Sequence, residues 1–92
     1  MKLKNKIAVV TGVSKGVGLE IVKQLLEKGT IVAGWGRTAP ELKHENFHFF
    51  ACDVSVEDQV EKAFTATVEK LGTDIRILVN NAGFGIAGKF EE

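Results

Sequence analysis

Three glycines that closely follow a short apolar run constrain the fold of this chain more than any other feature. The run covers residues 7–10 (Ile-Ala-Val-Val), and the glycines are Gly12, Gly16 and Gly18. A continuous apolar run of this length is typical of a strand buried on both faces. Glycines allow a sharp turn into a helix, whose unpaired first-turn N–H groups and dipole attract anions. The pattern therefore predicts a strand, a glycine turn and a helix start that binds a pyrophosphate-like group.

Strand and helix patterns alternate along the rest of the chain. Further strands are predicted over residues 30–33, 47–50 and 75–79. The stretch that contains Pro40 has room for at most a helical turn or two. The first helix is predicted to end at Gly29. Its apolar positions are Val17, Ile21, Val22, Leu25 and Leu26.

A second helix is predicted between the third and fourth strands. Ser55 and Asp58 have the spacing of a capping box, in which each side chain binds the other residue's backbone N–H. Gly72 is the predicted stop of this helix. Its apolar face is predicted to comprise Val56, Val60, Phe64, Val68 and Leu71.

This order of elements predicts an α/β fold with a parallel sheet and right-handed crossovers. The expected strand order is 3-2-1-4, with helices on both faces, which is about half of a doubly wound, Rossmann-type sheet. The 92 residues suffice for one small domain. The fourth strand is expected to lie at an open edge, and such an edge favours self-association.

Three motifs in register resemble those of the short-chain dehydrogenase/reductase family. Residues 11–18 (Thr-Gly-Val-Ser-Lys-Gly-Val-Gly) resemble its TGxxxGxG loop, Asp53-Val54 resembles its adenine-contacting pair, and residues 77–83 match its LVNNAG strand end. Residues 88–91 resemble the segment that follows in the family. The glycine spacing differs from GxGxxG, and the absence of Gly-Lys-Ser/Thr excludes a triphosphatase P-loop. Taken alone, the glycines also fit a tight strand-to-helix turn without a ligand.

The resemblance implies a role for the residues at each strand end. Asp53 would accept a hydrogen bond from the adenine amino group, and Val54 would contribute its backbone N–H. Asn80 would lie near the adenosine ribose and tie the fourth strand to the core. For Asn81, a turn after the strand and a direct cofactor contact remain equally open. The residues implied to bind the pyrophosphate, adjacent ribose and the rest of the cofactor are Gly12, Gly16, Val17, Gly18, Ala82 and Gly83.

Cofactor choice is predicted from charge near the end of the second strand. An acidic residue there binds both ribose hydroxyls and favours NAD. This chain instead has Arg37 in that region, and Lys15 precedes the second loop glycine. By resemblance to NADP-preferring members, this pair would bind a 2′-phosphate, with a hydroxyl from Ser14. The sequence therefore predicts NADP, with NAD less favoured; the alternative is two solvated surface cations.

The catalytic elements of the resembled family are missing. Its hydride transfer depends on a tyrosine, a lysine four residues later and a serine, all downstream of NNAG. This chain has no tyrosine, and its two serines, Ser14 and Ser55, precede that motif. No catalytic residue is therefore assigned. We expect an NADP(H)-binding N-terminal fragment of an oxidoreductase that interconverts alcohols and carbonyls, inactive alone; the alternative is a stand-alone nucleotide-binding or interaction module.

Composition narrows the partners further. Twelve basic and twelve acidic residues cancel, which gives no field to attract nucleic acid or an anionic membrane. The first 46 residues carry a net +4 and the last 46 a net −4, which suits a phosphate-bearing ligand near the N-terminus. His44 and His48 lack a third ligand nearby, so no metal site is predicted. Trp35 and the single Cys52 are expected in the core, and the setting is expected to be cytoplasmic.

Overall fold

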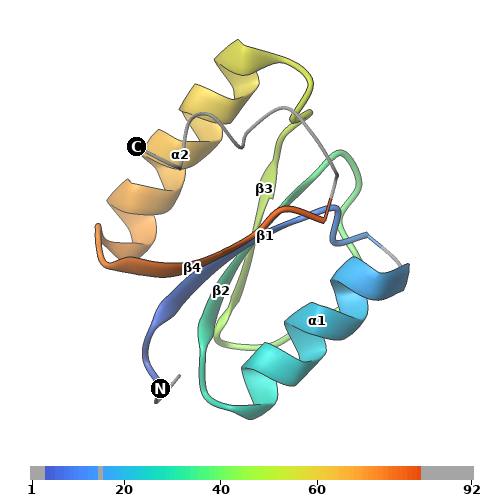
Figure 1. The fold of residues 1–92 in the computed structure, drawn as a ribbon, viewed down its shortest axis with the longest axis vertical. Coiled ribbons are helices and arrows are strands. Elements are labelled where there is room, and N and C mark those ends of the chain that lie inside the picture. The colour runs from blue at the N-terminus through green and yellow to red at the C-terminus, as the bar shows by residue number, and fades with distance from the viewer. Residues whose placement is uncertain (1–3, 15, 82–92) are drawn as a thin grey trace.

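The computed structural model of the chain describes residues 4–14 and 16–81, which form four strands and two helices (Figure 1). In chain order these elements are β1 (Ile7–Thr11), α1 (Gly16–Glu27), β2 (Ile31–Gly36), β3 (Phe47–Ala51), α2 (Glu57–Leu71) and β4 (Ile75–Val79). All strand pairs are parallel, and the sheet order is β3-β2-β1-β4. This confirms the predicted α/β fold and its strand order.

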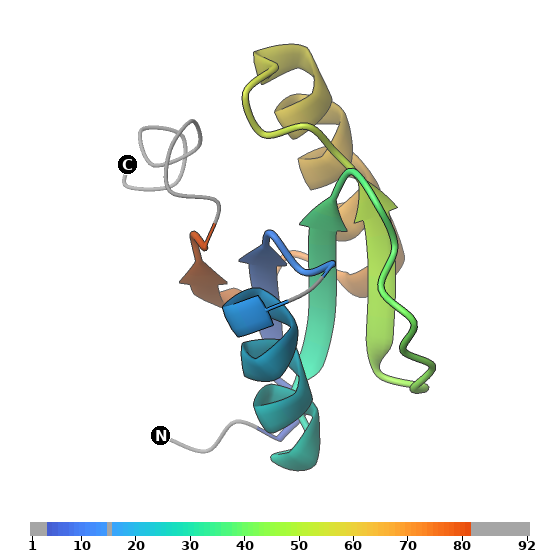
Figure 2. The ribbon, with the colours of Figure 1, turned by 90° about the vertical axis from the view of Figure 1, so that its right-hand side faces the viewer.

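The sheet lies between the two helices, with α1 on one face and α2 on the other (Figure 2). All five residues of β1 are buried, as expected for a central strand covered on both sides. Alternation along β1 sends Val9 toward α2 and Val10 toward α1. The two faces of the sheet therefore have separate apolar cores.

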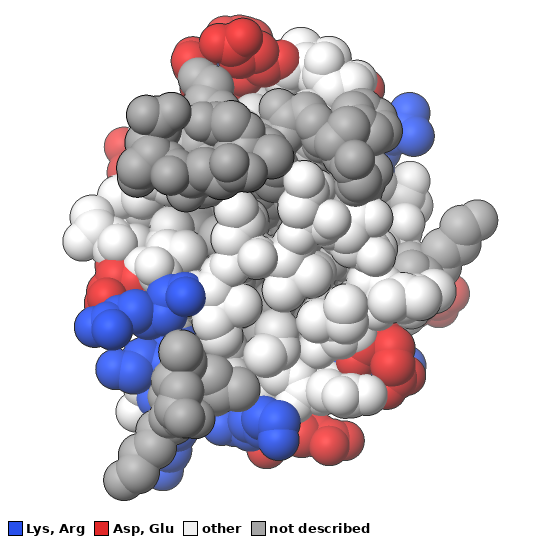
Figure 3. All heavy atoms as spheres, viewed as in Figure 1, with Lys and Arg blue, Asp and Glu red and all other residues white. Residues whose placement is uncertain are grey.

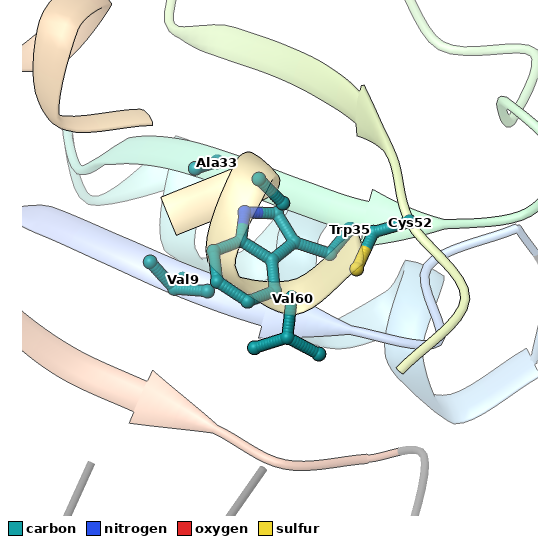
Figure 4. Packing of buried hydrophobic residues seen from close by; sticks show 6 residues of the cluster. Val9, Ala33, Trp35, Cys52 and Val60 are labelled. Carbon is teal, nitrogen blue, oxygen red and sulfur yellow. The ribbon is translucent and has the colours of Figure 1, made fainter. Parts of the chain in front are cut away.

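Trp35 is the largest residue of the core on the α2 side. Its indole is fully buried and packs with Val9, Cys52 and Val60 (Figure 4). The indole Nε1 donates a hydrogen bond to Thr67 Oγ1 at 3.0 Å. These contacts confirm that Trp35 and Cys52 are core residues.

Strand β2 continues three residues beyond the predicted range of 30–33. Gly34 is buried, and a Cβ on it would lie 2.8 Å from a ring carbon of Phe47 and 3.1 Å from Val13 Cγ2. The glycine thus lets the Phe47 ring lie against the strand, and pairing with β3 reaches Gly36. The predicted strand ended before these two glycines, whereas both are strand residues, and Gly34 is close-packed.

The predicted capping box of α2 is wrong. The N-cap is Val56, which makes no side-chain cap bond. Ser55 instead donates through its backbone N–H and its Oγ to Asp53 Oδ1, at 3.0 and 2.6 Å. The Ser55 hydroxyl therefore donates to the Asp53 carboxylate, two residues earlier, and does not cap α2.

The predicted apolar face of α2 is only partly correct. Val60 is buried, but Val56 and Phe64 are 39% and 40% exposed. Steps of four residues drift about 40° around a helix per step, so a long series of them leaves one face. Ala63 and Thr67 lie against the sheet instead, and they are small enough to bring α2 close to Trp35.

The first helix follows its prediction more closely. Val22 and Leu26 are buried, and Ile21 and Leu25 pack against the same core. Val17 is the exception, with 68% of its surface exposed at the first turn. Gly29 ends the helix with a φ of 81°, as Gly72 ends α2 with a φ of 108°.

Candidate functional site

A pocket of about 560 Å³ lies where the carboxyl ends of β1, β2 and β3 meet. Parallel sheets of this kind bind ligands at the carboxyl ends of their strands. The pocket brings together five predicted site residues from three separate strand ends. Its lining comprises Gly12, Ser14, Trp35, Gly36, Arg37, Thr38, Cys52, Asp53 and Val54.

The glycine loop between β1 and α1 forms one wall of this site. Gly12 and Gly16 have φ values of 67° and 68°, a conformation that side chains disfavour. A Cβ on Gly16 would meet no atom within 4 Å, so the space above it is open. The first turn of α1 contains no acidic residue, and its N–H groups have no partners within the helix. The loop therefore fits a phosphate group in both space and charge.

Gly18 serves the packing of the loop. It is buried, and a Cβ there would collide with Gly12 O and lie 2.7 Å from Asn81 Nδ2. Only glycine lets the start of α1 lie this close to the end of β1. Val17, by contrast, is largely exposed beside the open space.

Asp53 lines the pocket from the end of β3, two residues after that strand. Its Oδ1 accepts both hydrogen bonds from Ser55, and its N–H donates to Gln59 Oε1 at 2.7 Å. The Ser55 hydrogen bonds, helped by the charge of Arg37, hold the pKa of the Asp53 carboxyl below its ordinary value. Asp53 is therefore an ionised acceptor at neutral pH.

Arg37 projects from the end of β2 and is exposed at the pocket. Cys52, also in the lining, is 3% exposed; burial, with a contribution from Asp53, raises the pKa of its thiol. The thiol is thus protonated and inert at neutral pH. Three predicted site residues, Lys15, Ala82 and Gly83, lie outside the described residues.

The two asparagines after β4 connect this strand to β1 and the glycine loop. Thr11 Oγ1 donates to Asn80 Oδ1 at 3.4 Å, and to Val79 O at 3.5 Å. Asn81 Nδ2 donates to Gly12 O at 3.1 Å. Asn80 thus ties β4 to the core as expected, and Asn81, left open by the sequence, binds protein backbone.

The sequence patterns did not predict that Gln59 and Ser55 form hydrogen bonds with Asp53 at this site. Gln59 stands six residues after Asp53, and its side chain returns from the first turn of α2. The signal available was Ser55 two residues after an aspartate, which is the spacing of an Asx turn.

The described residues contain no cluster of three or more His, Cys, Asp or Glu side chains suited to a metal ion. His44 Nδ1 accepts a hydrogen bond from the Asn46 N–H at 3.0 Å. His48 is half-buried on β3, where burial, with the charge of Lys70, lowers the pKa of its imidazole. Neither helix in the described ranges has the length and apolarity needed to cross a membrane.

Comparison with known proteins places this architecture among dehydrogenases. The 3-beta-hydroxysteroid dehydrogenase of Comamonas testosteroni is 39% identical over 97 aligned residues, which cover 98% of this chain and 37% of that protein. The ligand-free aldohexose dehydrogenase of Thermoplasma acidophilum superposes with a TM-score of 0.79 at 30% identity, covering 86% of this chain and 30% of that chain. A short chain dehydrogenase from Leptospira borgpetersenii with bound NAD+ shares the fold, with a TM-score of 0.77 at 21% identity. The match covers 86% of this chain and 32% of that chain.

This chain spans about a third of the length of the curated relatives that it matches. A family sequence model described as short chain dehydrogenase matches residues 6–92, so the match includes the glycine loop, the pocket and both asparagines. Members of that family are oxidoreductases that bind NAD(P). With a parallel sheet of order 3-2-1-4 and this match over nearly all its residues, the chain belongs to the short-chain dehydrogenase family.

Proposed function

We propose that this chain is the NADP(H)-binding, N-terminal part of a short-chain oxidoreductase that interconverts alcohols and carbonyls. The observation that carries the proposal is one pocket in which Gly12, Arg37 and Asp53 meet from the ends of three strands. Each offers a group suited to a different part of a dinucleotide. Oxidoreductase relatives over most of the chain favour this function over a stand-alone interaction module.

The adenine would lie beside Asp53 and Val54. Asp53 Oδ2 receives no hydrogen bond from another described residue, because both bonds from Ser55 go to Oδ1. An adenine edge presents an amino donor beside a ring-nitrogen acceptor, which suits a carboxylate oxygen followed by a backbone N–H. Asn80, at the end of β4, would lie near the adenosine ribose.

The pyrophosphate would bind at the glycine loop. Open space above Gly16, the positive end of α1 and the exposed Val17 leave that surface accessible. Gly18 would contribute by keeping α1 close to β1. Ala82 and Gly83 are proposed to pack against the cofactor, as the family resemblance implies.

The 2′-phosphate selectivity would come from Arg37. Its guanidinium offers paired donors that match phosphate oxygens, and it stands at the strand end where an acid would favour NAD. Lys15 and Ser14 are proposed to add a second charge and a hydroxyl. The neighbour that holds NAD+ is 21% identical and has no bearing on this choice.

When bound, the nicotinamide supplies a hydride donor or acceptor. The residues of this chain bind and orient the cofactor, and they include no tyrosine for substrate proton transfer. We therefore propose that the 92 residues bind cofactor without turning over a carbonyl substrate. We also infer a cytoplasmic setting, the default for a chain with a single cysteine.

Calorimetry with NADPH and NADH tests the proposed function. The wild-type chain should bind NADPH about 10- to 100-fold more tightly, as expected for charge-assisted hydrogen bonds to the phosphate. Arg37→Asp should reverse this order. Lys43→Asp, an equal charge change on an exposed loop residue outside the pocket, should preserve it. Equal affinity of the wild-type chain for both cofactors would contradict the NADP assignment.

We further propose that the chain self-associates through β4. Among the described strands, β4 pairs only with β1 and forms one edge of the sheet. Figure 3 looks onto this side, where uncharged atoms fill the middle of the visible described surface and charged side chains surround them. Sedimentation velocity should show a dimer at tens of micromolar that dissociates on dilution; a compact monomer throughout would exclude this association.

A further inference from the structure

Two residues that follow Asp53 in the chain, one in the loop after β3 and one in α2, hold its side chain and its backbone. Ser55 donates to Asp53 Oδ1 through its backbone N–H at 3.0 Å and its hydroxyl at 2.6 Å. Gln59, in the first turn of α2, accepts from the Asp53 N–H at 2.7 Å. Both the side chain and the backbone of Asp53 are therefore oriented by residues that do not line the pocket.

These hydrogen bonds use some of the polar atoms of the loop and leave two others available. The Asp53 N–H and Oδ1 are occupied. Asp53 Oδ2 and the Val54 N–H have no hydrogen-bond partner elsewhere in residues 4–14 and 16–81. One acceptor and one donor from successive pocket residues thus remain.

Gln59 connects this pair to the core. It directly precedes Val60, which is 2% exposed and packs with Trp35 on the sheet. The docking of α2 therefore fixes the backbone from which the Gln59 side chain reaches Asp53. An Asp53 held this way keeps its orientation before any ligand arrives, which lowers the entropy lost on binding.

We propose that Ser55 and Gln59 are positioning residues that make the Asp53–Val54 pair selective for a 6-aminopurine over a 6-oxopurine. The inference rests on the proposed function, in which this pair binds the adenine. A 6-oxopurine presents an oxygen to the carboxylate and a ring N–H to the Val54 N–H, so both contacts become repulsive. Selectivity requires Oδ2 to stay in place, because a carboxylate able to rotate can avoid the oxygen.

The test compares NADPH with its hypoxanthine analogue, using the full 92-residue chain and calorimetry. The wild-type chain should prefer NADPH. Ser55→Ala and Gln59→Leu should each reduce that preference by about 3- to 10-fold, the scale of one hydrogen bond. Ser55→Thr, which keeps the hydroxyl, should restore it. The matched control is Gln24→Leu, since within the described residues the Gln24 side chain bonds only to Glu20, on the exposed side of α1.

The outcomes separate the two proposals. If the wild-type chain binds neither compound, or both equally, the adenine site is wrong and this inference falls with it. If the wild-type chain prefers NADPH and both variants keep the full preference, the inference is overturned while the proposed function stands. Partial unfolding scales both affinities equally, so the ratio of affinities is unaffected by it.

A second measurement needs no variant and no ligand. In NMR spectra of the wild-type chain, the Ser55 amide proton should shift with the titration of the Asp53 carboxyl, since the two are hydrogen-bonded. A Ser55 amide that does not follow this titration would overturn the positioning role even if both variants failed to fold.

Discussion

Asn81 Nδ2 donates a hydrogen bond to Gly12 O at 3.1 Å, joining two residues 69 positions apart. Gly18 lies beneath this contact, where a Cβ would meet both partners. These contacts fix the distance between the end of β4 and the glycine loop. The geometry of the glycine loop, which we propose binds the pyrophosphate, therefore depends on a residue from the last described part of the chain.

Asn81→Ala should weaken cofactor binding more than it weakens folding. The variant removes the donor that holds Gly12 O, so we expect about a 3- to 10-fold loss in NADPH affinity from one hydrogen bond. Asn81 is exposed, and the melting temperature should change little. Calorimetry and thermal denaturation provide the two readouts. The control is Asn46→Ala, because the Asn46 side chain makes no hydrogen bond within the described part of the chain.

Thr67→Val should destabilise the fold. Thr67 Oγ1 accepts from Trp35 Nε1 and donates to Ala63 O at 2.7 Å, all in the core between α2 and the sheet. Removing the hydroxyl should cost about 1–3 kcal/mol of unfolding free energy. Urea denaturation followed by fluorescence of Trp35, the single tryptophan, measures this. Thr67→Ser should retain more stability than Thr67→Val; equal loss in both would contradict the hydrogen-bond explanation.

Thr30→Val should stabilise the fold by about 1 kcal/mol. Thr30 Oγ1 is fully buried and makes no hydrogen bond within the described residues, so its desolvation is uncompensated. Valine has nearly the same shape without the polar atom. Thr11→Val is the contrasting control, because it removes the contacts to Asn80 and Val79 and should destabilise. A Thr30→Val variant less stable than wild type in urea would refute this account.

His48 should make stability fall on mild acidification. Its folded-state pKa lies below the ordinary value of 6.5, mainly through burial, with a contribution from Lys70. The unfolded chain therefore binds more protons between these two pKa values, and stability rises with pH across that window. The contribution is complete above pH 6.5 and decreases as pH falls toward the folded pKa. His48→Gln should flatten this part of the pH profile of urea midpoints; a profile that keeps its slope in this variant would contradict the role of His48.

Local patterns in the sequence determined the elements and much of the site. The apolar run of β1, the stop at Gly29 and the chemistry of Gly12, Arg37 and Asp53 are readable from neighbours within a few positions. Because the strands are predicted to be parallel, their carboxyl ends are expected at the same edge of the sheet. The pocket accordingly contains residues that the sequence had marked from three separate segments.

Tertiary structure decided which polar groups are partners and which face of α2 is buried. Ala63 and Thr67 face the sheet because the Trp35 indole, 32 positions from Thr67, leaves room only for small residues and offers a donor there. Likewise, Asn81 reaches Gly12 only after β4 pairs beside β1. Periodicity and residue chemistry act over a few positions and are visible in sequence. Hydrogen-bond partners and the rotation of a helix depend on distances that exist only once the layers have packed.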